Sequence, residues 1–204
     1  MLRAFVDASK ASKPGGPPIL AIAGFVGTVS GWSSFQKKWR EVRTKSGLGY
    51  FHMTDFMSRK AKPYKDWTEK KRNAVIGRLI ELINRHLLFG VSAAVNIADL
   101  SAYARAGKNR LRSGHNPYSF CASQVIGLVI HALEFNKINE QVMWIFEGGD
   151  RGQPEFIASM NRICSVPEKL RESFRIFSVM PGSKKQFPGL DAADFLAWET
   201  PQHV

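Results

Sequence analysis

The chain has 204 residues, 44% of them hydrophobic and 23% charged, which fits a soluble globular protein of one domain and excludes a fibrous or low-complexity chain. Its net charge of +12 favours polyanionic partners such as nucleic acid, the alternative being a well-solvated basic surface. Residues 1–100 carry 17 basic and 7 acidic side chains, against 12 and 10 in residues 101–204.

Two cysteines are too few for a disulfide framework, so we expect both to be reduced and structural. The N-terminal residues do not have the pattern of a secretory signal peptide. No run approaches the roughly 18 apolar residues that a membrane span needs. We therefore expect a cytoplasmic protein that does not enter a membrane.

The first half of the chain predicts a hairpin followed by helices and a further strand. Two apolar runs are separated by a loop rich in proline and glycine, as in a hairpin with a long connection. Trp32, Phe35 and Trp39 recur at helical spacing. The predicted elements are strands at 2–7 and 19–26, a helix at 31–45, a short aromatic strand at 50–56, a helix that Thr68 caps, and a strand at 89–97.

The second half alternates helices and strands. Asn116 and Pro117 open a long helix to Phe135 that is apolar almost all round, which predicts burial against a sheet. The elements that follow are a strand at 141–147, a helix at 154–164, a strand at 174–179 and a helix at 189–199. This order predicts a single α/β domain spanning residues 1–204.

Four acidic residues stand out because they close predicted strands or lie on the last helix. Asp7 and Glu147 each end a strand, so they emerge side by side if those strands are parallel neighbours. Asp191 and Asp194 are three apart and share roughly one face of the helix. Converging carboxylates repel unless a cation neutralises them, and hard divalent cations prefer oxygen ligands. The pattern predicts a metal site, although acids at such positions also cap helices.

His52 and Asp55 form a smaller cluster after an aromatic run. His52 could extend the acidic site as a proton shuttle, since the histidine pKa of about 6.5 permits proton exchange near neutral pH. The alternative is a structural, hydrogen-bonded histidine with Asp55 as a helix cap.

Two basic groups are interleaved with aromatic residues. Cations contact phosphates and an adjacent aromatic ring can stack on an unpaired base, so both groups are candidate nucleic-acid contacts. Two solvated loops are the alternative. The first group, around Tyr64 and Trp67, is Arg59, Lys60, Lys62 and Lys65, and the second, after Tyr103, is Arg105, Lys108, Arg110 and Arg112.

Four short motifs occur in an order that resembles the domain of unknown function 3800 family, a branch of the ribonuclease H-like superfamily. They lie at residues 5–9 (FVDAS), 51–56 (FHMTDF), 146–150 (FEGGD) and 190–199 (LDAADFLAWE). The resemblance implies a mixed sheet whose first three strands are antiparallel, with helices on both faces. It also implies an acidic metal centre with Asp7 on the first strand, Glu147 on its neighbour and Asp194 on the last helix.

Two positions depart from the family pattern. The family usually has an acid after the first aspartate, where this chain has Ala8, and a glutamine where this chain has Asp191. Our hypothesis is a metal-dependent nuclease or related phosphoryl-transfer enzyme acting on DNA or RNA. Its catalytic residues would be Asp7, Glu147, Asp194 and His52, and Mg²⁺ or Mn²⁺ would be held by Asp7, Glu147, Asp191 and Asp194. The alternative, which Ala8 favours, is a non-catalytic ribonuclease H-like module that binds nucleic acid or a protein partner.

Overall fold

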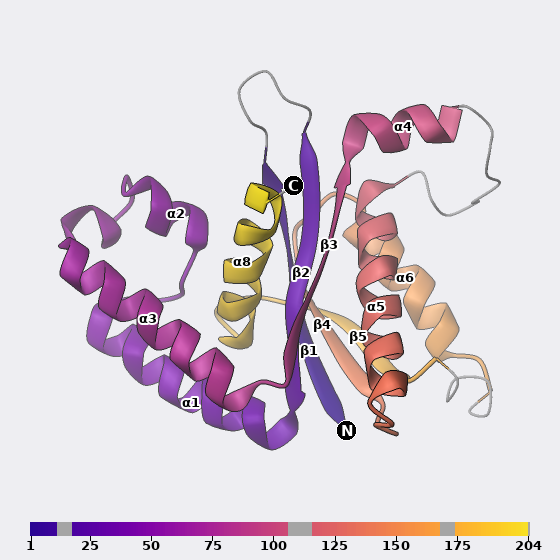
Figure 1. Ribbon diagram of the computed structural model, residues 1–204, viewed down its shortest axis with the longest axis horizontal. Helices are drawn as coiled ribbons and strands as arrows, with labels where there is room; N and C mark the ends of the chain where they lie inside the picture. The colour runs from indigo at the N-terminus through magenta and orange to yellow at the C-terminus, as the bar shows by residue number, and fades with distance from the viewer. Residues whose placement is uncertain (12–17, 106–115, 168–173, 204) are drawn as a thin grey trace.

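A computed structural model describes residues 1–11, 18–105, 116–167 and 174–203 (Figure 1). The strands are β1 (Leu2–Ala11), β2 (Ile19–Thr28), β3 (Phe89–Asn96), β4 (Val142–Glu147) and β5 (Ile176–Gly182). The helices are α1 (Val29–Ser46), α2 (Met53–Ser58), α3 (Glu69–His86), α4 (Ile97–Arg105), α5 (Pro117–Phe135), α6 (Gln153–Cys164) and α8 (Gly189–Glu199). Short 3₁₀ turns occupy Tyr64–Asp66 and Thr200–His203.

The five strands form one mixed sheet in the order β3-β2-β1-β4-β5. β1 is antiparallel to β2, and β2 to β3, whereas β4 runs parallel to β1 and β5 parallel to β4. This is the mixed sheet that the ribonuclease H-like resemblance implies, with its first three strands antiparallel. The parallel pairing of Val6 with Phe146 confirms that Asp7 and Glu147 end neighbouring strands at the same edge.

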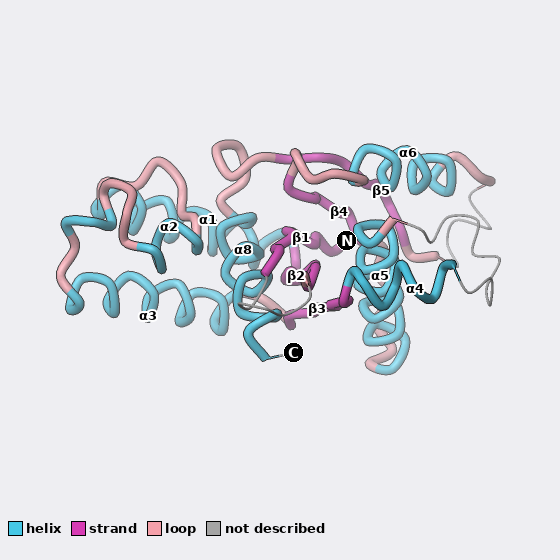
Figure 2. Tube along the Cα trace, turned by 90° about the horizontal axis from the view of Figure 1, so that it is seen from above, coloured by secondary structure: helices cyan, strands magenta, loops and turns pink. Residues whose placement is uncertain are grey.

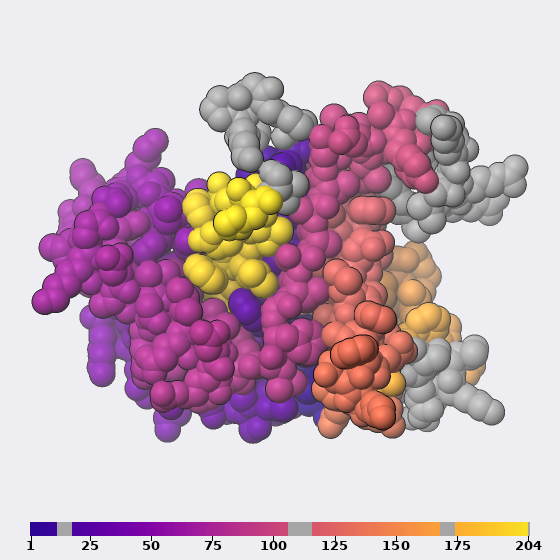
Figure 3. Space-filling view, in the orientation of Figure 1, coloured from indigo at the N-terminus to yellow at the C-terminus, as the bar shows by residue number. Residues whose placement is uncertain are grey.

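Helices cover both faces of the sheet, as expected (Figure 2). On one face, α5 and α6 pack over inward side chains such as Val6 and Phe146. On the other face, α8 packs on β1 and β2, and α1 and α3 pair with each other beside it. The space-filling view shows α8 between α3 and β3 (Figure 3). Because side chains alternate along a strand, Phe5, Asp7, Ile145 and Glu147 point towards the α8 face.

Residues 50–56 are not the strand that their aromatic composition predicts. Residues 53–58 form helix α2 instead, and Phe51 precedes it as a buried anchor. Met53 and Phe56 are three apart, so a helix directs both into the core, whereas a strand would direct them to opposite faces. Strand β1 is also longer than predicted, because residues 8–11 continue the ladder with β2 as far as Ile19.

Helix α5 departs from expectation in two ways. It has 19 residues and, within the described ranges, it is long and apolar enough by length and composition to cross a membrane, contrary to the prediction that no segment is. It is also not buried all round. Val125 and Val129 pack into the core, whereas Leu128 and Phe135 are exposed. In this fold the apolar run therefore serves as a one-sided cover for β2 and β3.

A candidate acidic site centred on a lysine

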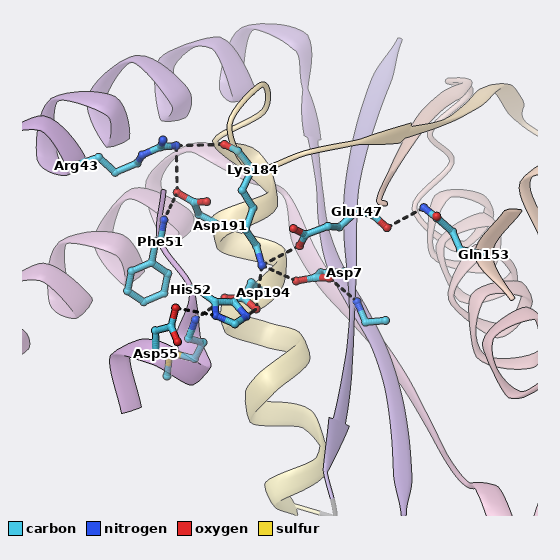
Figure 4. Close-up of polar contacts among 12 residues, drawn as sticks. Asp7, Arg43, Phe51, His52, Asp55, Glu147, Gln153, Lys184, Asp191 and Asp194 are labelled. Carbon is cyan, nitrogen blue, oxygen red and sulfur yellow. Dashed lines mark hydrogen bonds and ion pairs between the residues drawn. The ribbon is translucent and has the colours of Figure 1, made fainter. Parts of the chain in front are cut away.

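Three carboxylates from distant parts of the chain converge on a single side chain, Lys184. Its ammonium Nζ lies 3.2 Å from Asp7 Oδ2, 2.8 Å from Glu147 Oε2 and 3.2 Å from Asp194 Oδ1 (Figure 4). Asp7 comes from β1, Glu147 from the end of β4 and Asp194 from α8. The structure thus brings together three of the four acids that the sequence singled out, around a cation that it did not.

Lys184 lies on the turn between β5 and α8, where no periodic pattern identifies a functional residue. Phe187 N donates to Ser183 O at 2.8 Å, and this turn directs the Lys184 side chain inward. Only 7% of the residue is exposed, although it is one of two adjacent lysines in a polar loop. The signal that was available is its position, shortly before the helix that carries Asp194.

The electrostatics of the cluster follow from burial and from its unequal numbers of charges. Asp7 is 5% exposed, and burial raises its pKa well above the ordinary value; Lys184 opposes this rise, and the neighbouring carboxylates add to it. Burial opposes the charge on Lys184, but its three acidic neighbours outweigh burial and raise the ammonium pKa. One ammonium faces three carboxyl groups, so the acidic groups of the site outnumber its cation.

His52 lies beside this cluster. Its Nε2 is 4.0 Å from Asp194 Oδ1, and its Nδ1 is 3.2 Å from Asp55 Oδ2. The backbone N–H of Met53 donates to Asp194 Oδ2 at 2.5 Å, which ties the start of α2 to α8. The segment from His52 to Asp55 is therefore adjacent to the acidic site, as the sequence hypothesis required.

Asp191 does not join the other three acids. It is fully buried, and its Oδ2 accepts hydrogen bonds from Trp39 Nε1 at 2.8 Å, Arg43 Nη1 at 3.3 Å and Phe51 N at 3.3 Å. Burial raises the Asp191 pKa to about 7, against the opposing effect of Arg43 and these hydrogen bonds. These contacts give Asp191 a structural role, joining α1, the segment before α2 and α8, in place of the metal-binding role that we predicted.

The basic groups are partly placed. Arg59, Lys60, Lys62 and Lys65 are exposed between α2 and α3, and Arg59 pairs with Glu69. Arg105 is exposed at the end of α4, whereas Lys108, Arg110 and Arg112 lie outside the described residues. The ends of α2 and α4 lie on opposite sides of the sheet (Figures 1 and 2), so Arg105 does not share a patch with the first group.

Of the two aromatic residues of the first basic group, Tyr64 is buried and cannot stack on a base, and Trp67 is partly exposed. Tyr64 is buried against Phe51 and Phe56, and the Trp67 ring packs on it at a centroid distance of 5.1 Å. Lys71 Nζ lies 4.6 Å from the centre of the Trp67 ring. These rings stabilise the fold of this segment.

A cavity of about 470 Å³ opens beside the cluster. Two basic side chains, two aromatic ones, a serine and one of the three acids line it, namely Lys184, Lys185, Tyr50, His52, Ser183 and Glu147. The cluster can therefore be reached from solvent on the side of His52 and Lys184.

No protein-family model and no curated protein matches the sequence. Among solved structures, the chain is similar to a chain in the structure of the PCNA:RNase HII complex from Archaeoglobus fulgidus, with 12% identity and a TM-score of 0.43, covering 100% of this chain and 74% of that chain. It is also similar to ribonuclease H2 from Pyrococcus horikoshii OT3, with 14% identity and a TM-score of 0.43, covering 100% of this chain and 73% of that chain. A third similar structure is Bst-RNase HIII in complex with Mn²⁺, with 11% identity and a TM-score of 0.44, covering 98% of this chain and 52% of that chain. These likenesses are distant, and the ribonuclease H-like fold class rests on the strand order and directions given above.

Proposed function

We propose that this protein is a metal-dependent nuclease, or a related phosphoryl-transfer enzyme, acting on DNA or RNA. The observation that supports this most directly is the convergence of Asp7, Glu147 and Asp194 on one cationic centre, with all three oxygens within 3.2 Å of the Lys184 ammonium. The net charge of +12 is consistent with a polyanionic substrate. Membership of the domain of unknown function 3800 family and a cytoplasmic location are part of the same proposal.

The donor set fits a hard divalent cation. Asp7, Glu147 and Asp194 offer carboxylate oxygens, which Mg²⁺ and Mn²⁺ prefer. In the described part of the chain, no three acidic, histidine or cysteine side chains are arranged to hold a metal. One oxygen of each carboxylate lies 2.8–3.2 Å from the Lys184 ammonium, so the three side chains could together hold a cation there. Asp191 is left out of the set because it does not contact Lys184 and its Oδ2 is held by Arg43 and Trp39.

Bound metal would supply activation of the attacking water and stabilisation of the leaving oxygen. The chain's own residues would perform the remaining tasks. His52 lines the cavity and lies 4.0 Å from Asp194, so its Nε2 can carry a proton between the site and solvent. Asp55, at 3.2 Å from Nδ1, fixes the orientation of the imidazole ring. Lys185 at the cavity, and Lys60 and Lys62 beyond α2, would contact phosphates.

Ala8 does not argue against activity in this geometry. Its side chain packs on the α5 side of the sheet, opposite to Asp7, because neighbouring residues in a strand alternate between faces. Its backbone N–H donates to Asp7 Oδ1 at 2.7 Å and helps to orient the carboxylate. An acid at position 8 would therefore point away from the cluster.

The alternative function, a non-catalytic module that binds nucleic acid or a protein partner, is favoured by one observation. The Lys184 ammonium already compensates the three carboxylates in part, so the fold does not depend on a metal to hold them together. The two functions differ in whether the site turns over a phosphodiester.

The test is cleavage of labelled single-stranded, double-stranded and hybrid nucleic acids with Mn²⁺, Mg²⁺ or chelator. We expect metal-dependent cleavage that Asp7→Asn abolishes while binding persists. Asp66→Asn, which changes an exposed carboxylate on the 3₁₀ turn, is the matched control and should cleave normally. Cleavage that survives Asp7→Asn would refute the assignment of the site. Binding without cleavage under every condition would establish the non-catalytic alternative.

A further inference from the structure

We infer that Lys184 is a displaceable internal cation, whose ammonium holds the three carboxylates together until a divalent metal enters and displaces it. This inference rests on the proposed function and adds how metal binding at the site is regulated. It assigns to Lys184 a role that neither the motifs nor the proposed ligand set includes.

The first step is that the lysine and a metal compete for the same atoms. Nζ contacts Asp7 Oδ2, Glu147 Oε2 and Asp194 Oδ1, one oxygen from each proposed ligand. A metal coordinated by these oxygens would sit where the ammonium now lies. Two cations in contact inside a buried site repel strongly, so the ammonium has to leave before the metal is fully coordinated.

The second step is that the backbone of Lys184 is anchored whereas its side chain has room to move. Gln186 N and Phe187 N both donate to Ser183 O, at 3.0 and 2.8 Å, and Arg43 Nη1 lies 3.4 Å from Lys184 O. The side chain is a flexible four-carbon stem. The cavity of about 470 Å³ is lined by Lys184 itself together with Ser183 and Lys185, so the displaced ammonium can turn into it without unfolding the turn.

The third step is the consequence for affinity. When a metal binds to the natural protein, three ion pairs of the Lys184 ammonium must break. These ion pairs are buried, since Lys184 is only 7% exposed. A site without this ammonium would keep the carboxylates and lack the competitor. The lysine therefore weakens metal binding and, in return, stabilises the metal-free protein by offsetting carboxylate repulsion.

The experiment compares the natural protein with Lys184→Met, and with Lys37→Met, which removes an exposed lysine on α1, as the matched control for loss of one positive charge. Isothermal titration with Mn²⁺ measures affinity directly, and thermal denaturation over a Mn²⁺ series measures it through stabilisation of the folded state. We expect Lys184→Met to bind Mn²⁺ at least about tenfold more tightly, to melt lower in chelator, and to recover with metal. Lys37→Met should bind Mn²⁺ like the natural protein.

Each outcome has a distinct meaning. Equal Mn²⁺ affinity in the natural protein and in Lys184→Met would overturn this inference and leave the proposed metal site standing. Absence of binding in both would overturn the metal site itself, and with it the inference. Tighter binding that persists when Asp7→Asn is added to Lys184→Met would place the metal elsewhere and would also overturn it.

A second measurement needs no variant that might fail to fold. Lys184 is the only buried lysine among the described residues. Its ammonium protons should therefore exchange slowly with water and give a distinct ¹⁵N resonance. We expect Mg²⁺ titration to shift this resonance and abolish its protection as the side chain enters the cavity. A resonance that stays protected at metal saturation would refute displacement.

Discussion

Replacing Arg43 by methionine should destabilise the protein by an amount that grows with pH. Arg43 is buried and its Nη1 lies 3.3 Å from Asp191 Oδ2, so the substitution leaves a fully buried carboxylate without its cation. Removing one partner of a buried ion pair costs about 3–5 kcal/mol when the other stays ionised. The cost is lower wherever Asp191 can instead take up a proton.

The sign follows from the Asp191 pKa of about 7 in the folded protein, well above the carboxyl's ordinary value. A carboxyl group whose pKa is raised on folding contributes stability in full at pH values below its pKa in the unfolded chain. This contribution is lost as the pH rises through its pKa in the folded protein. Arg43 lowers the Asp191 pKa, so its removal raises that pKa further. We therefore expect a loss of about 1–2 kcal/mol near pH 5.5 and of about 3 kcal/mol or more near pH 8.5.

Urea denaturation at the two pH values measures the loss, because its midpoint and slope give the free energy of unfolding. Asp191→Asn removes the titrating group, so adding Arg43→Met to it should cost the same at both pH values. Arg78→Met, which breaks an exposed pair with Glu81, is the surface control and should cost no more than about 0.5 kcal/mol. An equal loss near pH 5.5 and near pH 8.5 for Arg43→Met alone would refute the reasoning.

Three further predictions concern packing, binding and thiol chemistry. Gly24→Ala should lower the free energy of unfolding, measured in urea, by about 3 kcal/mol or more, because the added Cβ would collide with the Phe5 carbonyl. Gly77→Ala, on the open face of α3, is the control and should raise it by about 0.5–1 kcal/mol. Similar effects of the two substitutions would refute the contact. If Lys60 and Lys62 contact phosphates, changing each to glutamine should reduce the slope of the logarithm of the nucleic-acid binding constant against the logarithm of salt concentration by about 0.7–0.9 per contact. An unchanged slope would show that the substituted lysine does not contact a phosphate. Burial raises the pKa of Cys121 to about 12, so a thiol reagent near neutral pH should modify Cys121 only on unfolding; rapid modification of the native protein would contradict this.

The main framework of the fold could be predicted because its strands and helices have clear periodicity. The hairpin, the strand before Glu147 and the last helix follow from apolar runs of the right length, and the pairing of Val6 with Phe146 confirms that Asp7 and Glu147 are neighbours. The prediction for residues 50–56 was wrong because aromatic composition favours strands in general. Here Phe51 packs against Tyr64, and residues 53–58 form a short helix that contacts α8.

The candidate site was less predictable than the fold, for two physical reasons. Asp191 and Asp194 are three apart, and at about 100° per residue their side chains diverge by about 60° around the helix axis. That divergence sends Asp191 towards Arg43 and Asp194 towards Lys184 (Figure 4). Lys184 lies on a polar turn, where the local sequence predicts a solvent-exposed side chain. The three carboxylates that surround it come from other segments of the chain, so the residues next to Lys184 do not indicate them.

The position of β1 in the middle of the sheet has a consequence for biosynthesis. β1 leaves the ribosome well before β4, which begins at Val142 and completes one of the hydrogen-bonding edges of β1. At a synthesis rate of about 5–20 residues per second, that edge waits roughly 7–30 s for its partner. During this interval an apolar strand with unpaired amides can associate with other nascent chains, so we expect yield in cells to depend on chaperones that shield this edge.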